Sequence, residues 1–435
     1  MNAPRASNIR PAASLLVLRD GARGVEVLLM RRPERGDNDF RSGACVFPGG
    51  VLDATDPTAW RWCLGQDDAT ASARLGLSEG GLDYFVAALR ECFEEVGLLF
   101  VCRPDGSPAD LAVHEEALRH WRSRLHHGEA TIAQLCAAFD WRLDLREMAY
   151  FSHWLTPVVR PKRFDTRFFV RLAPPGQQAL PDMGEALELM WLTPDEALQP
   201  QRALKLLNVT QRTLHDMRGF ASARAAFDHA LALRGVALHL PRPALGRDGP
   251  RFVIESDPAY DEVARLDPDG RGDMRCDLDP GELTQLSPRL WRIHGQAACT
   301  YLVTDSARTE AAVIDADATD AARWQALCAW SVAPVRQLLF TQAGDAPAPA
   351  LRAHWPQALV GGAAAAGQTV KLGEDATLLA VAGYAGCLAF VLHEECTLVG
   401  NSTDEALAGP AGAVEWLAPR QGFMQRKTPR TVRSP

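Results

Sequence analysis

The sequence predicts a mixed α/β protein, of the α+β kind, that is divided into two domains. Two apolar runs, residues 14–19 and 25–31, are joined by a polar turn with two glycines, which is typical of a β-hairpin. Apolar residues then recur at helical spacing between residues 82 and 96. A Pro-, Gly- and Asp-rich stretch, residues 240–281, separates this first half from a second series of short apolar runs. A chain of 435 residues is long enough to build a core in each half.

The composition fits an intracellular globular protein that acts on something other than nucleic acid. The chain is 47% apolar and 23% charged, and its 46 basic and 54 acidic residues give a formal net charge of −8. Because no basic stripe offsets this acidic balance, we expect no nucleic-acid partner. The ten cysteines include no Cys-x-x-Cys pair, which favours the reduced thiols of a cytoplasmic protein over disulfides or a zinc site.

No segment predicts insertion into a membrane or secretion. No run of the chain approaches the length of about 18 apolar residues that a membrane helix needs, so we expect no membrane partner. Residues 1–10 lack the apolar core of a signal peptide, although Arg5 and Arg10 leave an organelle-targeting segment as an alternative.

The most informative stretch is residues 90–98, Arg-Glu-Cys-Phe-Glu-Glu-Val-Gly-Leu, at the end of the predicted helix. At about 100° per residue, the apolar positions of the helix share one stripe, whereas Glu91, Glu94 and Glu95 lie on the opposite side. Like charges at this spacing destabilise a helix, and a divalent cation would reverse that effect. A solvated acidic helix face is the alternative explanation.

A sharp bend is predicted ahead of this helix. Residues 44–47 form a short apolar strand, and residues 48–50 read Pro-Gly-Gly. Such a sequence turns the chain tightly and leaves backbone carbonyl groups free to face a ligand.

Together the two segments resemble the Nudix box: a Gly, five residues, an acid, seven residues, and then Arg-Glu, an apolar residue, any residue, Glu-Glu, any residue, Gly and an apolar residue. Gly50 matches the glycine, Asp56 stands where the first acid should be, and residues 90–98 match the second half position by position. Arg90 stands 26 positions later than the uninterrupted pattern would place it. A longer insertion at this point is a feature of the Nudix-type-19 branch, whose members resemble coenzyme A and acyl-CoA diphosphatases.

The resemblance to the type-19 branch continues well beyond the box. Three later segments match its strands and closing helix, namely residues 152–157, 161–169 and 188–198. The resemblance implies a Nudix domain, an α/β/α sandwich, over residues 10–235. Within it we expect an insertion at about 54–80 that packs as a flap, because it contains Trp60 and Trp62, and added helices at about 108–140.

The resemblance also implies a metal site. Glu94 and Glu95 are expected to be the principal ligands of a Mg²⁺ or Mn²⁺ ion, and Glu91 is a ligand or the general base. The Gly50 carbonyl is a further expected ligand, and such oxygen donors suit these ions. Arg90 is expected to pair with a box glutamate and fix its rotamer.

Further candidates lie outside the box. A downstream acid often takes part in this family, and the sequence does not choose between Glu185 and Glu188. Three basic residues would meet phosphate oxygens or else are ordinary strand-surface charges, namely Lys162, Arg163 and Arg167. Four histidines lack the paired spacing of metal ligands, so we expect them at the surface or in aromatic packing, namely His114, His120, His126 and His127.

The expected substrate is a small nucleoside diphosphate derivative. The type-19 resemblance implies coenzyme A or an acyl-CoA. Shorter coenzyme A-hydrolysing relatives carry an upstream signature, Leu-Arg-x-His-x-Gly-Glu-Val, of which residues 40–47 retain Gly43 but neither the His nor the Glu. ADP-ribose or a dinucleotide is therefore the alternative substrate. A Nudix-fold binding protein without turnover is the alternative to an enzyme, and the intact glutamate cluster disfavours it.

The second half, residues 285–424, resembles a shortened metallo-β-lactamase-like αββα domain. Its apolar strands are expected at residues 299–303, 311–316, 338–341, 388–392 and 397–400. The metal-binding motifs of that family are replaced: the run after the third strand reads Gln-Ala-Gly-Asp-Ala-Pro, and Gly-Tyr, Gly-Asn and Pro-Arg-Gln-Gly stand at the later positions. Because these side chains cannot hold a dinuclear site, we expect no metal-dependent activity there.

No catalytic role is expected for the remaining segments. Residues 236–284 are expected to be a linker, and residues 425–435 a flexible tail. The second domain is expected to serve in packing, in covering the Nudix cleft or in forming a possible homodimer.

Overall fold

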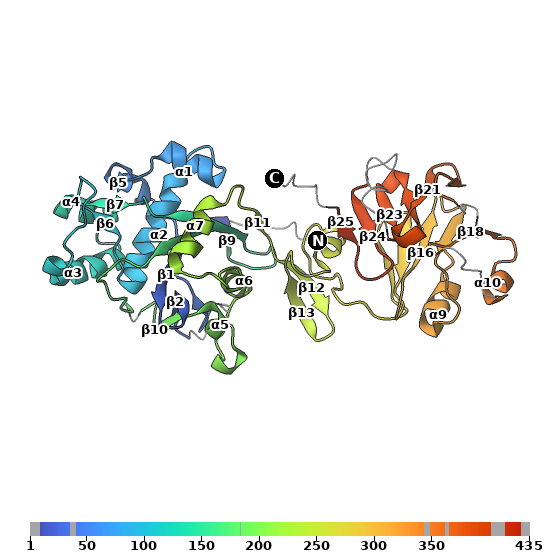
Figure 1. Cartoon of the computed structure of the whole chain (residues 1–435), viewed down its shortest axis with the longest axis horizontal. Coiled ribbons are helices and arrows are strands. Elements are labelled where there is room, and N and C mark those ends of the chain that lie inside the picture. The colour runs from blue at the N-terminus through green and yellow to red at the C-terminus, as the bar shows by residue number, and fades with distance from the viewer. Residues whose placement is uncertain are drawn as a thin grey trace. The chain divides into compact units, whose positions relative to one another are not determined.

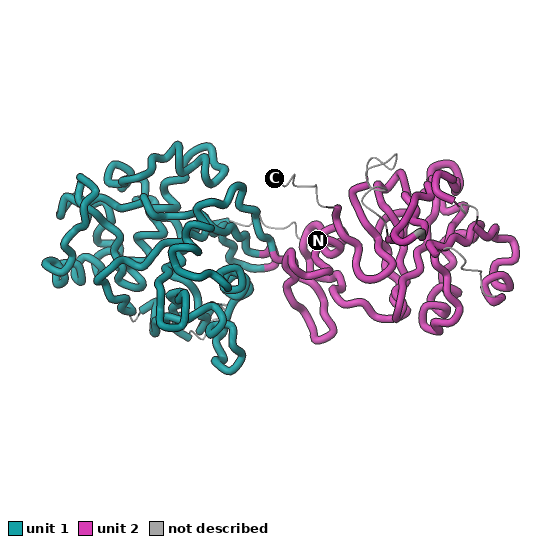
Figure 2. The backbone as a smooth tube through the Cα atoms, viewed as in Figure 1, with its two compact units in different colours: residues 1–156, 160–240 teal, residues 157–159, 241–435 magenta. Residues whose placement is uncertain are grey.

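The computed structural model describes residues 9–34, 41–182, 184–342, 349–361, 365–401 and 414–427. The chain forms two compact units (Figure 2). The first unit contains residues 1–156 and 160–240, and the second contains residues 157–159 and 241–435. In the part of the chain that the structure describes, no helix has the length and apolar character needed to cross a membrane.

The first unit is built on one mixed sheet with the order β10-β2-β1-β9-β8-β11, to which β3 and β4 add short pairings with β2 and β1 (Figure 1). Its strands are β1 (Ile9–Gly21), β2 (Gly24–Arg31), β3 (Cys45–Val46), β4 (Gly49–Val51), β8 (Ala149–Leu155), β9 (Arg163–Leu172), β10 (Glu188–Leu192) and β11 (Leu238–His239). The predicted hairpin is confirmed, since Gly21 pairs with Gly24 at the turn between β1 and β2. The central pair β1 and β9 runs parallel.

Helices cover both faces of this sheet, which confirms the predicted α/β/α arrangement. Helix α2 (Gly81–Val96) packs its apolar stripe on one face, where Phe85 lies 4.5 Å from Phe169 of β9 between ring centroids. Helix α7 (Ala223–Ala232) contacts β1, β8 and β9 and buries Phe227 on the other face. The α2 layer therefore holds the carboxylate-bearing helix against the centre of the sheet.

The insertion inside the box is packed, as expected from its tryptophans. It forms η1 (Asp56–Trp62), β5 (Cys63–Leu64) and α1 (Asp68–Leu75). The Trp60 indole donates to Asp83 of α2 at 2.7 Å, and Trp62 packs against the main core. This segment therefore begins and ends against the same helix.

The added helices follow the box. They are η2 (Ala112–His114), α3 (Glu115–His126) and α4 (Ile132–Phe139), and a small sheet joins β5, β7 (Arg142–Asp144) and β6 (Val101–Cys102) beside them. The unit ends in α5 (Pro194–Ala197), η3 (Pro200–Arg202) and α6 (Asn208–Asp216), followed by α7 and β11.

The second unit contains two six-stranded sheets that enclose one apolar cluster. The first sheet comprises β14 (Leu283–Gln285), β15 (Leu290–Ile293), β16 (Thr300–Thr304), β17 (Ala311–Ile314), β18 (Val335–Leu339) and β19 (Leu359–Val360). The second comprises β20 (Thr369–Leu372), β21 (Ala376–Ala382), β22 (Leu388–Leu392), β23 (Thr397–Val399), β24 (Trp416–Ala418) and β25 (Gln425–Arg426), with η4 (Tyr384–Gly386) and η5 (His393–Glu395) between its strands. Helices α9 (Ala321–Ala329) and α10 (Pro349–His354) bury Leu327 and Leu351 against the outer face of the first sheet (Figure 1).

The segment expected to be a linker, residues 236–284, is instead ordered: it begins with β11 of the first unit and belongs to the second unit from residue 241 onward. It contains the hairpin β12 (Arg242–Gly246) and β13 (Gly249–Val253) and the helix α8 (Tyr260–Leu266). Its glycines and prolines form turns of a folded segment, and buried Glu262 of α8 binds Arg292 of β15. The first residues of the expected flexible tail are instead part of a sheet, because Gln425 and Arg426 form β25, which pairs with β24. Residues 428–435 lie outside the described residues.

Candidate catalytic site

The polar side of α2 faces the Pro-Gly-Gly bend. The Gly49 backbone N–H donates to Glu95 at 2.7 Å. A Cβ atom on Gly50 would lie 2.4 Å from the Glu91 carboxylate, so only glycine allows this approach. The bend at β4 therefore brings its backbone against two of the three predicted carboxylates, as the sequence led us to expect.

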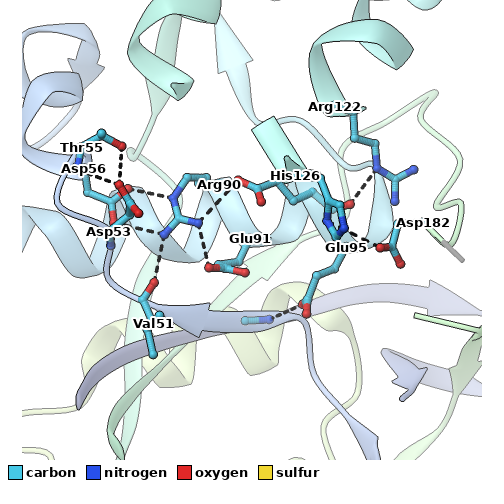
Figure 3. Close-up of polar contacts among 12 residues, drawn as sticks. Val51, Asp53, Thr55, Asp56, Arg90, Glu91, Glu95, Arg122, His126 and Asp182 are labelled. Carbon is cyan, nitrogen blue, oxygen red and sulfur yellow. Dashed lines mark hydrogen bonds and ion pairs between the residues drawn. The ribbon is translucent and has the colours of Figure 1, made fainter. Parts of the chain in front are cut away.

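Arg90 connects these carboxylates to the insertion (Figure 3). Its Nε donates to Asp56 at 2.8 Å and its Nη2 to the same carboxylate at 3.2 Å. Its Nη1 donates to Glu91 at 2.7 Å and lies 3.5 Å from Glu94, while Nη2 also donates to the Val51 carbonyl at 3.0 Å. The predicted pairing of Arg90 with box glutamates thus occurs, and Asp56, at the start of the insertion, holds the same guanidinium.

The cluster is removed from solvent, contrary to the alternative of a solvated helix face. Asp56 is fully buried and Glu95 is 1% exposed. Burial raises the pKa of Glu94 to about 7 and also raises the pKa of Glu91. Burial, and then the charge of Glu91, raise the pKa of Glu95 well above its ordinary value. Helical periodicity alone placed these residues opposite the core, whereas the bend and the insertion cover them.

The charges do not balance within the cluster. Four carboxylates share Arg90 and, more distantly, Arg32, which lies 3.9 Å from Glu95. The Glu95 Oε1 atom is buried without a hydrogen-bond partner. A hard divalent cation such as Mg²⁺ or Mn²⁺ prefers such oxygen donors and would offset the excess negative charge.

The carboxylates are not arranged as a preformed ion cage. Among the described residues, no three acidic, His or Cys side chains converge on one point as metal ligands. Glu91 and Glu94 turn toward Arg90, and Glu95 turns toward the Gly49 N–H. A bound ion would therefore compete with Arg90 for Glu91 and Glu94.

The structure separates the two downstream acids. Glu185 lies in the loop before β10, and its negative charge is a lesser cause, after burial, of the raised pKa of Glu91 and of Glu95. Glu188 begins β10 and pairs with Arg31 at 3.1 Å, with about half of its side chain exposed. Glu185 precedes β10 and lies in the loop, whereas Glu188 is the first residue of the strand. The sequence alone did not show where this strand begins, so it could not separate the two acids.

The three basic candidates occupy different environments. Arg167 pairs with Ala13 in the parallel register, and Ala13 pairs with Gly50 on its other side, so Arg167 and Gly50 lie in one row across the sheet. Its guanidinium lies 4.3 Å from the Tyr84 ring centroid of α2, its Nη1 donates to Asp165 at 3.3 Å, and its Nε has no hydrogen-bond partner among the described residues. Arg163 is buried and donates to the Thr156 carbonyl at 2.8 Å, and Lys162 is exposed.

The four histidines lie where the sequence led us to expect them, at the surface or in aromatic packing. His114 packs against Phe139 and Trp141, which stack on each other, and His120, His126 and His127 are exposed. His126 lies 3.7 Å from Asp182, a residue that the sequence gave no reason to single out.

In the second unit, described residues at or beside the replaced metal motifs bind other groups of the protein. Asp315 accepts from the backbone N–H and the hydroxyl of Thr341, each at 2.7 Å, and Arg420 lies 3.3 Å from it. The Tyr384 N–H donates to the Asn401 carbonyl at 3.1 Å. Residues 343–348, within the third-strand motif, lie outside the described residues. The polar groups at the described positions therefore bond to other protein groups. Among the described residues, no cluster of metal-ligating side chains is found.

Comparison with known proteins identifies relatives of this chain. Residues 78–208 match the sequence profile of the NUDT19 Nudix domain. The human acyl-coenzyme A diphosphatase NUDT19 is 30% identical over 285 residues, covering 55% of this chain and 73% of that protein. The chicken protein of the same name is 28% identical over 343 residues, covering 65% of this chain and 86% of that protein. A solved NUDIX hydrolase from Alicyclobacillus acidocaldarius is 27% identical, covers 51% of this chain and 97% of that chain, and gives a TM-score of 0.43.

Proposed function

The chain belongs to the NUDT19 branch of the Nudix hydrolases, and we propose that it hydrolyses the diphosphate bond of coenzyme A or an acyl-CoA with the help of a divalent cation. Hydrolysis of a diphosphate bond is the reaction of its named relatives. The observation that carries the proposal for this chain is the buried group of carboxylates around Arg90, placed against the Gly49–Gly50 backbone.

The cation would be held by Glu91, Glu94 and Glu95 with the Gly50 carbonyl. A Mg²⁺ or Mn²⁺ ion bound there would neutralise charge on the phosphate oxygens and would lower the pKa of a water molecule. The uncompensated charge of the cluster and the unpartnered Glu95 oxygen support this assignment.

The chain's own residues would then orient the reacting groups. Arg90 is fixed by Asp56, and it limits the rotamers of Glu91 and Glu94. The proposed acceptors of a proton from the attacking water are Glu91, by its place in the box, and Glu185, from the loop before β10, whose charge acts on Glu91 and Glu95. A carboxylate in this role must be ionised, which a neighbouring cation favours.

Arg167 is the strongest of the three basic candidates for contact with the substrate. Two strand spacings, about 10 Å, separate its Cα from that of Gly50. An extended arginine side chain covers much of this distance, and a guanidinium binds phosphate oxygens by paired hydrogen bonds. Lys162 and Arg163 remain proposed contacts at the start of the same strand.

The test is a substrate screen in the presence and absence of Mg²⁺ and Mn²⁺. Coenzyme A, a medium-chain and a long-chain acyl-CoA, ADP-ribose and a dinucleoside polyphosphate are incubated with the full-length protein, and products are separated by chromatography. Cleavage of the coenzyme A diphosphate releases adenosine 3′,5′-bisphosphate and a phosphopantetheine. Metal-dependent appearance of these products supports the proposal, and cleavage of ADP-ribose alone contradicts it.

A further inference from the structure

The loop that carries Glu185 is tied to the end of the carboxylate-bearing helix. This loop, residues 173–187, connects β9 to β10, and Met183 within it lies outside the described residues. Gln177 exchanges hydrogen bonds with both backbone groups of Leu99, at 2.9 and 2.7 Å. The Leu180 N–H donates to the Val96 carbonyl at 2.9 Å. The loop is therefore held where α2 ends.

Arg122 of α3 bridges the same two elements, and its contact with α2 is drawn in Figure 3. Its Nε donates to the Glu94 carbonyl at 2.9 Å and its Nη2 donates to the Leu180 carbonyl at 2.8 Å. The Glu94 carbonyl belongs to the last turn of α2, where carbonyl groups lack helical partners and a cation is favourable. Helix α2 has no basic residue of its own in this turn. An arginine from an added helix thus supplies that charge.

Asp182 completes the connection on the Glu185 side. Its carboxylate accepts from the Glu185 N–H at 3.0 and 3.1 Å and from the Ala186 N–H at 2.7 Å. The side chain of Asp182 is 9% exposed, and His126 of α3 lies 3.7 Å from it. The backbone of Glu185 is consequently fixed by a residue that itself contacts α3.

We propose that Arg122 and Asp182 are positioning residues for Glu185, which they hold at a fixed distance from Glu91 and Glu95. This inference rests on the proposed function, because it gives Glu185 a part in the reaction. One hydrogen bond leads from α3 to the Glu185 loop, from Arg122 to the Leu180 carbonyl, and a second, longer contact of 3.7 Å joins His126 of α3 to Asp182. The added helix α3 would then hold the loop beside the reaction site in place, and it also packs against the core.

The first arm of the test measures the loop directly and needs no substrate. Amide hydrogen exchange of the full-length protein is followed by mass spectrometry in Arg122→Ala, Asp182→Asn and the control Arg119→Ala, whose side chain on the same helix is 69% exposed. We expect faster exchange in residues 178–187 for the first two variants and unchanged exchange for the control. Unchanged exchange in both Arg122→Ala and Asp182→Asn would overturn the proposal.

The second arm is a double-mutant cycle on the rate of diphosphate hydrolysis. Arg122→Ala and Asp182→Asn should each lower kcat by about 10-fold or more, as expected for lost orienting contacts, with a smaller change in KM. In the Glu185→Gln background the same substitutions should have no further effect, because residues that act as one unit are not additive. Arg122→Lys should restore part of kcat, and a full additive loss would overturn the positioning role.

The two arms separate this inference from the proposed function. If the wild-type protein hydrolyses none of the substrates in the screen, the proposed function fails, and hydrogen exchange still decides whether Arg122 and Asp182 hold the loop. If Arg122→Ala does not fold, Asp182→Asn carries both measurements, because it keeps the shape of the side chain and the position of α3.

Discussion

Arg90 donates two hydrogen bonds to Asp56, a residue that lies 34 positions earlier in the chain and is fully buried. The pair joins the two halves of the Nudix box across the insertion. Because the same guanidinium binds Glu91 and approaches Glu94, the conformation of the insertion is coupled to the carboxylate cluster. This relationship leads to the first prediction.

Asp56→Ala should destabilise the first unit by about 3–5 kcal/mol, since it removes a fully buried carboxylate that accepts two hydrogen bonds from Arg90 and leaves the buried ion network incomplete. Asp53→Ala is the matched control and should cost about 1 kcal/mol, because the Asp53 carboxylate is exposed and its hydrogen bonds in the described structure are with Thr55. Calorimetric unfolding of both variants measures the difference. Equal losses of unfolding free energy in the two variants would show that the buried Asp56–Arg90 pair stabilises the fold no more than an exposed carboxylate does.

Glu94→Gln should lower the rate of hydrolysis on the order of 10²-fold or more, a scale typical of lost electrostatic groups in active sites. Its folded structure should survive, because the amide keeps the shape of the carboxylate and the group is largely desolvated. The exposed Glu79→Gln serves as control and should keep the wild-type rate. A wild-type rate in Glu94→Gln would remove this residue from the reaction site.

Gly50→Ala should lower the rate by about 10²-fold, because the added methyl group would displace the Glu91 carboxylate and small misplacements are costly. Gly76→Ala is an informative comparison. Gly76 has a φ of +67° but open space around it, so its variant should lose stability without losing rate. Steady-state kinetics and thermal unfolding of both variants distinguish crowding at the site from backbone strain.

The metal-free protein should become more stable as the pH falls from about 7 toward 4.5. The pKa of Glu94 is raised from 4.5 to about 7 in the folded state, so between these values the folded protein binds a proton that the unfolded chain does not. Stability from this group is complete below about pH 4.5 and lost above about pH 7. Unfolding midpoints in EDTA at pH 5 and 7.5 should differ more in the wild type than in Glu94→Gln.

Metal should act in the opposite direction along the same pH range. Cation binding requires ionised carboxylates, so the affinity for Mn²⁺ should weaken as the pH falls below about 7. Calorimetric titration with Mn²⁺ at several pH values measures this, and an affinity independent of pH would contradict the assignment of the ion to these carboxylates.

Glu262→Ala should destabilise the second unit while leaving hydrolysis at the first unit unchanged. Glu262 and Arg292 are almost completely buried and form two hydrogen bonds, so loss of one partner should cost about 3–5 kcal/mol. The exposed pair of Asp269 and Arg271 offers a control, for which Asp269→Ala should cost about 0–1 kcal/mol. A large fall in activity would instead link the second unit to the reaction.

The sequence predicted the parts of the fold that depend on local pattern. The hairpin of β1 and β2, the helix from 81 to 96 and five of the twelve strands in the two large sheets of the second unit follow from apolar periodicity and turn residues. The sequence also led us to expect the Gly50 bend and the glutamates at one site, because they fit one box. These features are encoded by residues close together in the chain.

What the sequence could not supply depends on tertiary contacts. The segment with α8 was expected to be a linker because its prolines, glycines and aspartates resemble an irregular chain, yet Glu262 buries a charge against β15. No sequence pattern pointed to Asp182 or Arg122. Their contacts with the loop before β10 and with the end of α2 form only in the folded chain. The choice of Glu185 over Glu188 likewise depended on where β10 begins.

The central claim is that the carboxylates of α2 support metal-dependent cleavage of a coenzyme A diphosphate. Its most direct measurement is the release of adenosine 3′,5′-bisphosphate from an acyl-CoA by the wild type and by Glu95→Gln, each with Mg²⁺, with Mn²⁺ and with EDTA. The account predicts release by the wild type only when a cation is present, and a loss on the order of 10²-fold or more in Glu95→Gln. Release that persists in EDTA, or that is unchanged in the variant, would contradict it.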